Sequence, residues 1–165
     1  MQRSMRSVVV SDSGPLIALG RLDLLVVLPA LFAQVQVPRE VLSECLARPQ
    51  NTDAARIASA VARQWLTPCD ATPIAAEGLE LGERAAIGRA LEIGAGLLAD
   101  DRAARQHAAA LGLVVVGTLG VLIKAKRGGH VAAIGPLIES LRASGQRLSH
   151  AAVVDALAAA GEATG

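Results

Sequence analysis

Short runs of apolar residues alternate with longer amphipathic stretches along this chain. Residues 8–10 are all valine, and a β-branched run without polar alternation is typical of a strand covered on both faces of a parallel sheet. Residues 35–37, 97–99 and 113–116 are further predicted strands. Because helical stretches separate these runs, the order of elements predicts an α/β fold with parallel strands and right-handed crossovers.

Proline, glycine and apolar stripes at helical spacing predict the helices. The clearest stripe runs from Gly82 to Gly94, and Gly14-Pro15 leads into an apolar helix after the first strand. Residues 65–66 are predicted to be briefly extended, and residues 67–78 to form a loop. Further helices are predicted across residues 22–32, after Pro38, and at about 54–63, 102–111, 120–127, 134–143 and 149–160.

The composition raises the question of a membrane segment, with 52% hydrophobic residues and a mean hydropathy of +0.43. The longest apolar stretches, residues 24–33 and 111–123, are interrupted by proline or by glycine and threonine, and fall short of the roughly 20 residues of a spanning helix. The apolar run after Arg3 and Arg6 is too short for a signal peptide. We therefore expect a cytoplasmic protein without a membrane segment.

Charge and aromatic content narrow the modes of nucleic-acid binding. A formal net charge of +1 gives no global attraction for a polyanion, so any nucleic-acid surface has to be a local patch. One Trp, one Phe and no Tyr leave no platform for base stacking. Cys45 and Cys69 have neither metal-ligand spacing nor a disulfide framework, and we interpret them as buried thiols.

Aspartates follow two of the predicted strands. Asp12 ends the first strand, at the edge where open α/β sheets hold their ligands, and Asp100 and Asp101 directly follow residues 97–99. Asp12 fits a site in this crevice and also fits a cap on the following helix. Of the pair, we expect one residue to be a helix N-cap and the other to be a ligand.

Two glutamates are predicted to face the same edge of the sheet. On a helical wheel Glu83 lies in line with the buried stripe of its helix, where an unpaired carboxylate is costly. It could instead complement the helix dipole. Glu44 lies at the edge of its stripe and could be solvated, whereas Glu40 points away from the stripe and is predicted to be solvated.

A carboxylate cluster without His or Cys suits Mg²⁺ or Mn²⁺ rather than Zn²⁺. Such an ion can activate water and stabilise both oxygens of an in-line phosphodiester displacement, which is nuclease chemistry. The candidate metal ligands are Asp12, Glu44, Glu83, Asp100 and Asp101.

Polar and basic side chains near these acids suggest supporting roles. Ser13 and Thr118 could orient ligands through hydrogen bonds or could simply cap loops. Basic residues could place a nucleic-acid strand through phosphate contacts, or could form a solvated helix face. The candidates for phosphate contacts are Arg102, Arg105, Lys124, Lys126 and Arg127.

Several motifs occur in the order and spacing of a known family. They are D-S-G-P-L-I-A-L, V-P-R-E-V-L-S-E, L-G-E-R-A-A-I-G-R-A-L-E-I-G-A-G-L-L-A-D-D-R-A-A-R, V-V-G-T-L-G-V-L and the closing A-L-A-A-A-G-E. Together they resemble the PIN domain, and more narrowly a prokaryotic PIN-like branch of predicted nucleic-acid-binding proteins related to VapC-type toxins. The resemblance implies a three-layer α/β/α sandwich with a central parallel sheet of four to five strands. We expect a single domain over residues 1–165, with a helical C-terminal segment at about 131–165.

The resemblance also implies which acids are catalytic, because PIN domains bind Mg²⁺ or Mn²⁺ through an acidic cluster and cleave RNA. Matched motif by motif, Asp12, Glu44 and Glu83 correspond to the first three acids, and the spacing to the fourth favours Asp101 over Asp100. Two positions depart from the pattern. The third acid is Glu where many active members have Asp, and Ala99 stands where a Ser or Thr usually precedes the fourth acid.

We therefore predict a Mg²⁺- or Mn²⁺-dependent endoribonuclease acting on RNA as the toxin of a toxin–antitoxin pair, with an antitoxin partner and a homodimeric state. The alternative is a catalytically silent PIN-like module that binds RNA or protein. An aspartate-nucleophile phosphatase is disfavoured because Gly14 stands where its second acid is needed. A dinucleotide site is disfavoured because Gly94 and Gly96 precede a strand instead of opening a helix.

Overall fold

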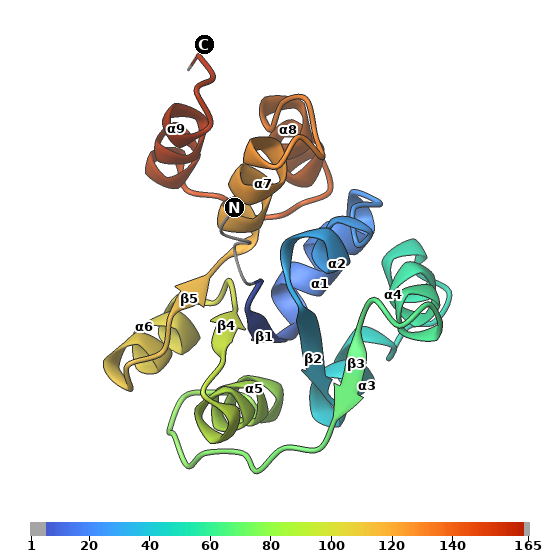
Figure 1. Cartoon of the computed structure of the whole chain (residues 1–165), viewed down its shortest axis with the longest axis vertical. Coiled ribbons are helices and arrows are strands. Elements are labelled where there is room, and N and C mark those ends of the chain that lie inside the picture. Colours follow the sequence, from blue (N-terminus) through green and yellow to red (C-terminus); the bar gives the residue numbers. More distant parts are fainter. Residues whose placement is uncertain (1–5, 164–165) are drawn as a thin grey trace, which may run out of the picture.

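A five-stranded, all-parallel sheet runs through the middle of the molecule (Figure 1). The computed structural model describes residues 6–163, so the predicted domain limits at residues 1 and 165 lie outside the described part. The strands, in the order β3-β2-β1-β4-β5, are β1 (Val8–Ser11), β2 (Gln34–Pro38), β3 (Thr67–Cys69), β4 (Gly96–Leu98) and β5 (Val115–Val116). The helices are α1 (Ser13–Arg21), α2 (Val27–Leu31), α3 (Arg39–Cys45), α4 (Thr52–Ala62), α5 (Leu81–Ile93), α6 (Arg102–Ala110), α7 (Thr118–Arg127), α8 (Gly135–Ala143) and α9 (His150–Ala159).

Helices flank the sheet, which confirms the predicted α/β architecture with a parallel sheet. Helix α5 packs against β1, β2 and β4, and α3 contacts both α5 and α1. Helix α1 also packs against α4 and α7, and α7, α8 and α9 lie at the opposite end of the view from α5 (Figure 1). Among residues 6–163, no helix combines the length and the apolar character needed to cross a bilayer.

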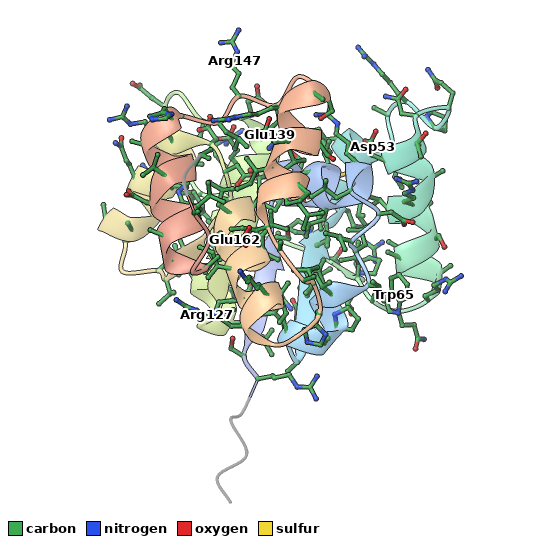
Figure 2. The ribbon with its side chains drawn as sticks, turned by 90° about the horizontal axis from the view of Figure 1, so that it is seen from above. Asp53, Trp65, Arg127, Glu139, Arg147 and Glu162 are labelled. Atoms are coloured by element: carbon green, nitrogen blue, oxygen red, sulfur yellow. The ribbon has the colours of Figure 1, made fainter. Side chains whose placement is uncertain are left out.

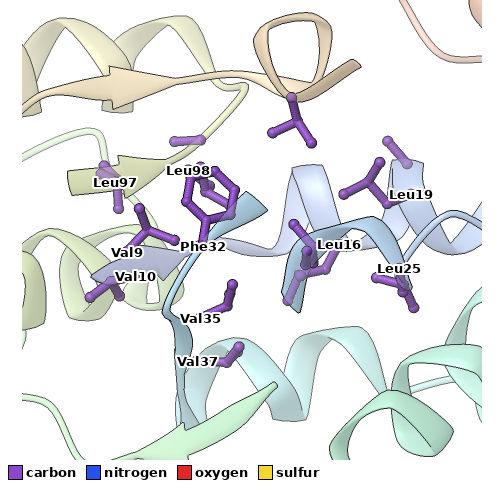
Figure 3. Packing of buried hydrophobic residues seen from close by; sticks show 14 of the residues in the cluster. Val9, Val10, Leu16, Leu19, Leu25, Phe32, Val35, Val37, Leu97 and Leu98 are labelled. Carbon is purple, nitrogen blue, oxygen red and sulfur yellow. The ribbon is translucent and has the colours of Figure 1, made fainter. Parts of the chain in front are cut away.

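The central strands form the core because both of their faces are covered. In β1, Val9 and Val10 are 4% and 0% exposed, and Figure 3 shows them among side chains from β2 and β4. Burial of apolar surface on both faces explains why β1 reads as an unbroken valine run. The two free cysteines, Cys45 and Cys69, are buried as predicted, and burial raises the pKa of the Cys45 thiol to about 12.

The edges of the sheet differ from the sequence-based prediction. Residues 67–69 form edge strand β3, although the proline-rich segment 67–78 was expected to be a loop. Proline is tolerated in β3 because an edge strand has one side with no ladder to complete. At the other edge, β5 is shorter than the predicted strand at residues 113–116, and Val114 is 72% exposed.

Candidate metal centre

Asp12 occupies the carboxyl end of the central strand. Its backbone N–H donates to the carbonyl oxygen of Leu98 at 2.9 Å, which ties the end of β1 to the end of β4. The side chain is only 5% exposed, makes no capping hydrogen bond to α1, and leaves Oδ1 enclosed without a hydrogen-bond partner among the described residues. An N-cap side chain ordinarily forms that bond, so Asp12 does not cap α1 through its carboxylate.

Glu44 reaches the same place from α3. The hydroxyl of Ser13, the residue after Asp12, donates to Glu44 Oε1 at 3.1 Å. Gly82, in the first turn of α5, packs so closely that a Cβ atom there would lie 2.9 Å from Glu44 Oε2 and 3.8 Å from Asp12 Oδ1. Glycine at this position therefore lets the first turn of α5 pack directly against the carboxylates of Glu44 and Asp12.

Glu83 follows Gly82 and is half-buried, as its position on the helical wheel predicts. Its Oε2 atom is enclosed and has no hydrogen-bond partner among the described residues. Burial, as the largest cause, and the negative charges of Asp101, Asp12, Glu80 and Glu44 together raise the pKa of this carboxyl to about 7. Glu83 thus faces the same acids that the sequence grouped with it.

The two consecutive aspartates after β4 have different partners. The carboxylate of Asp100 accepts hydrogen bonds from the backbone N–H of Thr118 at 2.7 Å and from its hydroxyl at 2.6 Å. Asp101 is the N-cap of α6 and accepts from the N–H of Ala104 at 3.0 Å. A Cβ atom on Gly14 would lie 3.3 Å from Asp100 Oδ2, so the turn after β1 and the turn after β4 are in contact. The expected N-cap of the pair is therefore Asp101.

The pKa of Asp12 shows that these acids form one electrostatic cluster. This pKa is raised from 3.8 to about 6 as the net result of burial, which raises it most, of the Ser13 backbone amide, which lowers it, and of the charges on Glu44, Asp101 and Asp100, which raise it. Among the described residues, none of the ion pairs involves any of the five acids. The cluster consequently holds negative charge that no arginine or lysine neutralises by direct pairing.

The stability of the protein should fall as pH rises from about 4.5 to about 7.5 without divalent metal. The folded-state pKa values of Asp12 and Glu83 lie above their ordinary values, so the folded state binds more protons across this window. The pKa of Glu162 is shifted in the opposite direction, to about 2, so the titration of Glu162 changes the stability mainly below this pH window. Thermal unfolding at several pH values checks the slope, and a midpoint that rises from pH 5 to pH 7.5 would contradict it.

The donor set fits a hard divalent cation. All candidate ligands are carboxylate oxygens, which Mg²⁺ and Mn²⁺ prefer, and two of these oxygens are enclosed without a partner. Across residues 6–163, no group of three or more His, Cys, Asp or Glu side chains is arranged so that it could hold a metal ion as it stands. Asp12 and Glu44 both lie against Gly82, so binding an ion would require the acids to move closer together.

The burial of one acid, Glu40, was predicted wrongly from the sequence. Glu40 was predicted to be solvated, yet it is half-buried and its Oε2 atom is enclosed without a hydrogen-bond partner in the described part of the chain. A helical wheel ranks positions only against the stripe of their own helix, so it misses burial by a neighbouring element. The pKa of Cys69 is raised by burial and in part by the Glu40 charge, which places Glu40 on the β3 side of α3.

The basic candidates divide into two groups. Arg102, Arg105, Lys124 and Arg127 line a pocket of about 950 Å³ that also reaches Asp100. Lys126 is not among its lining residues, because its Nζ pairs with Glu162 Oε2 at 3.0 Å. Sequence inspection missed Glu162, and it missed Arg147, which lines the same pocket from the segment before α9.

Comparisons with known proteins agree with this fold. The family model described as "DUF3368: PIN domain" matches residues 8–162. A search of solved structures finds a PilT N-terminus domain protein, SSO1118, from the hyperthermophilic archaeon Sulfolobus solfataricus P2. It has a TM-score of 0.52 and 17% identity, and the match covers 87% of this chain and 98% of that one. Among curated proteins, no sequence match was found.

Proposed function

Because this chain belongs to the PIN-domain family DUF3368, whose domains are generally associated with nucleases, we propose that it is a Mg²⁺- or Mn²⁺-dependent endoribonuclease. The observation that carries the proposal is Asp12, which is only 5% exposed yet keeps one carboxylate oxygen without a partner in the described residues. Burying an unpaired carboxylate costs free energy unless a cation compensates for it. That cost supports a role for Asp12 in binding metal.

The proposed ligands are Asp12, Glu44, Glu83 and one of the two consecutive aspartates. Asp101 caps α6 through Oδ2 and leaves Oδ1 for an ion, and Asp100, which accepts two hydrogen bonds from Thr118, is the further candidate. When bound, a divalent ion would supply a more acidic water and would stabilise charge on the phosphodiester oxygens. Ser13 would orient Glu44, and Thr118 would orient Asp100, through the hydrogen bonds described above.

Thr118 also bears on the silent alternative, which was motivated by the departures at Glu83 and Ala99. Ala99 is fully buried and has no hydroxyl to offer to an acid. Thr118 provides a hydroxyl to Asp100 at 2.6 Å from a different strand end. The Thr118 hydroxyl thus takes the place of the hydroxyl that Ala99 lacks, which supports the proposal of an active enzyme over that of a silent module.

Glu83→Gln tests the proposed function directly. We expect it to reduce cleavage of a single-stranded RNA in Mn²⁺ by at least about 10-fold, since the amide removes a charged ligand but keeps the shape. Glu92→Gln is the matched control, because Glu92 lies on the same helix but is exposed and pairs with Arg89 at 3.3 Å. Equal cleavage rates for Glu83→Gln and wild type would reject the assignment of Glu83.

The toxin role, the antitoxin partner, the homodimer and the cytoplasmic location stay predictions from the sequence and its resemblance.

A further inference from the structure

A groove of about 950 Å³ is lined by residues from the C-terminal half of the chain, and of the five acids it includes Asp100. Besides Asp100, residues of α6, β5, α7 and α9 line it. The segment before α9, residues 146–149, closes one side. The groove therefore connects the proposed centre with the helical C-terminal segment, which the metal cluster does not use.

The rim of the groove carries an excess of positive charge. Five basic residues line it, against Asp100 and Asp155 as the acidic lining residues. Figure 2 shows Arg147 projecting at the upper edge of the view and Arg127 much lower, so these two cations do not cluster at one point. The five basic lining residues are Arg102, Arg105, Lys124, Arg127 and Arg147.

One of these cations is fixed next to the acids. Arg105 Nη1 donates to the carbonyl oxygen of Ala99 at 2.9 Å, directly before Asp100. A Cβ atom on Gly117 would lie 2.5 Å from Arg105 Nη1 and 3.0 Å from Asp100 Oδ1, so both polar groups face the same turn. A phosphate held by Arg105 would consequently lie beside the acidic cluster.

The floor of the groove is aliphatic. It includes Val116, Leu119, Ile123 and Ala156, and none of the described lining residues is aromatic. Bases cannot stack on such a floor, although ribose and base edges can pack against it. A ligand would be held mainly by its negative charges, and its bases would have to be exposed, which favours a single strand over a duplex.

The wall of the groove formed by α9 is held to the rest of the molecule by Glu162, which lies just after α9. Its carboxylate accepts from the backbone N–H groups of Ile134 and Gly135 at 2.7 and 2.9 Å, and pairs with Lys126. Arg127 Nη2 also donates to the carbonyl oxygen of Ala159 at 3.3 Å. These contacts join α9 to α7 and to the start of α8, so the groove has a defined second wall.

We propose that single-stranded RNA lies along this groove, with its phosphates on the basic rim and one phosphodiester delivered to the acidic cluster. This inference rests on the proposed ribonuclease function for its substrate, but it assigns the C-terminal helices a task of their own. Charge complementarity and the continuity of the groove with Asp100 favour RNA over an acidic protein segment as the occupant.

Equilibrium binding of RNA without cleavage tests this proposal. The probe is a short fluorescein-labelled single-stranded RNA of mixed sequence, measured by fluorescence anisotropy in EDTA at several KCl concentrations. The variant is Lys124→Gln/Arg147→Gln, because both side chains line the groove and neither makes a hydrogen bond or an ion pair within residues 6–163. We expect affinity about 10-fold weaker, and a salt slope smaller by about 1.4, since each lost phosphate contact on a single strand contributes about 0.7.

Arg21→Gln/Arg48→Gln is the matched control, since it removes the same charge from exposed side chains that lie outside the groove and make no hydrogen bond or ion pair within residues 6–163. We expect wild-type affinity and salt slope for this control. Equal losses in both double variants, wild-type binding by the groove variant, no RNA binding by wild type, or equal affinity for duplex RNA would each overturn the proposal. If the groove variant loses RNA binding but wild type shows no cleavage in Mn²⁺, the groove assignment stands and the ribonuclease proposal fails.

Discussion

Asp12→Asn should reduce Mn²⁺-dependent RNA cleavage by more than about 100-fold. Mutating a residue that only holds a metal ligand in place already lowers metal affinity or activity about 10–100-fold, and Asp12 is a proposed ligand itself. The same change should stabilise the metal-free protein at pH 8. Ionised Asp12 is buried among acids that raise its pKa from 3.8 to about 6, so its charge destabilises the fold by an amount on the order of 1–3 kcal/mol. Asparagine removes that charge while preserving the shape of the side chain.

The pH dependence of the stability difference between Asp12→Asn and wild type shows whether the stabilisation comes from removing the Asp12 charge. Below about pH 3, Asp12 is protonated in both the folded and the unfolded state, so wild type and Asp12→Asn should converge in thermal stability. Asp70→Asn is the control, because Asp70 is 92% exposed in its side chain and its surface pair with Arg39 contributes little. Loss of stability in Asp12→Asn at pH 8, with cleavage retained, would contradict the assignment of Asp12.

Gly88→Ala should be the most destabilising single methyl addition in α5. A Cβ atom on Gly88 would lie 2.0 Å from the carbonyl oxygen of Thr72, which is backbone and cannot rotate away. The segment around Thr72 is fixed to α5, because the N–H of Ile74 donates to the carbonyl oxygen of Arg84 at 3.1 Å. Overpacking against backbone should cost about 3 kcal/mol and lower the thermal midpoint by about 6–12 °C.

Gly120→Ala is the matched control for Gly88→Ala, since it makes the same change inside α7. There the new Cβ would meet Val116 Cγ1 at 2.8 Å, a side-chain atom that can shift. The better helix propensity of alanine offsets part of that cost, so we expect a change within about 1 kcal/mol. Equal stability of Gly88→Ala and wild type in chemical denaturation would contradict the close packing of the 70–80 segment on α5.

The fold could be predicted from local patterns wherever burial is nearly complete. The valine run of β1 and the stripe of α5 each specify their element because both are surrounded by apolar neighbours. The short edge strands were harder to predict. Strand β3 contains Pro68, and β5 has an exposed flank at Val114, so neither has the pattern of a covered strand.

The part of the candidate site that lies at strand ends could be predicted, because the topology of a parallel sheet brings those ends together. Asp12 and the Asp100-Asp101 pair follow adjacent strands β1 and β4, and parallel strands bring such residues to the same edge. The distinct partners of Asp100 and Asp101 could not be derived from sequence, because they depend on where Thr118 meets β4. The enclosure of Glu40 and the close approach of Gly82 likewise depend on packing between helices that no single-helix pattern records.

Titration calorimetry of the metal-free protein with Mn²⁺ at pH 8 tests the central claim most directly, namely that carboxylates from separate elements bind one divalent ion. We expect saturable binding to wild type, weakened by at least about 10-fold in Asp12→Asn and in Glu83→Gln. The exposed controls Asp70→Asn and Glu92→Gln should bind Mn²⁺ as wild type does. Absence of saturable binding to wild type, or equal affinity in Asp12→Asn, would contradict the account.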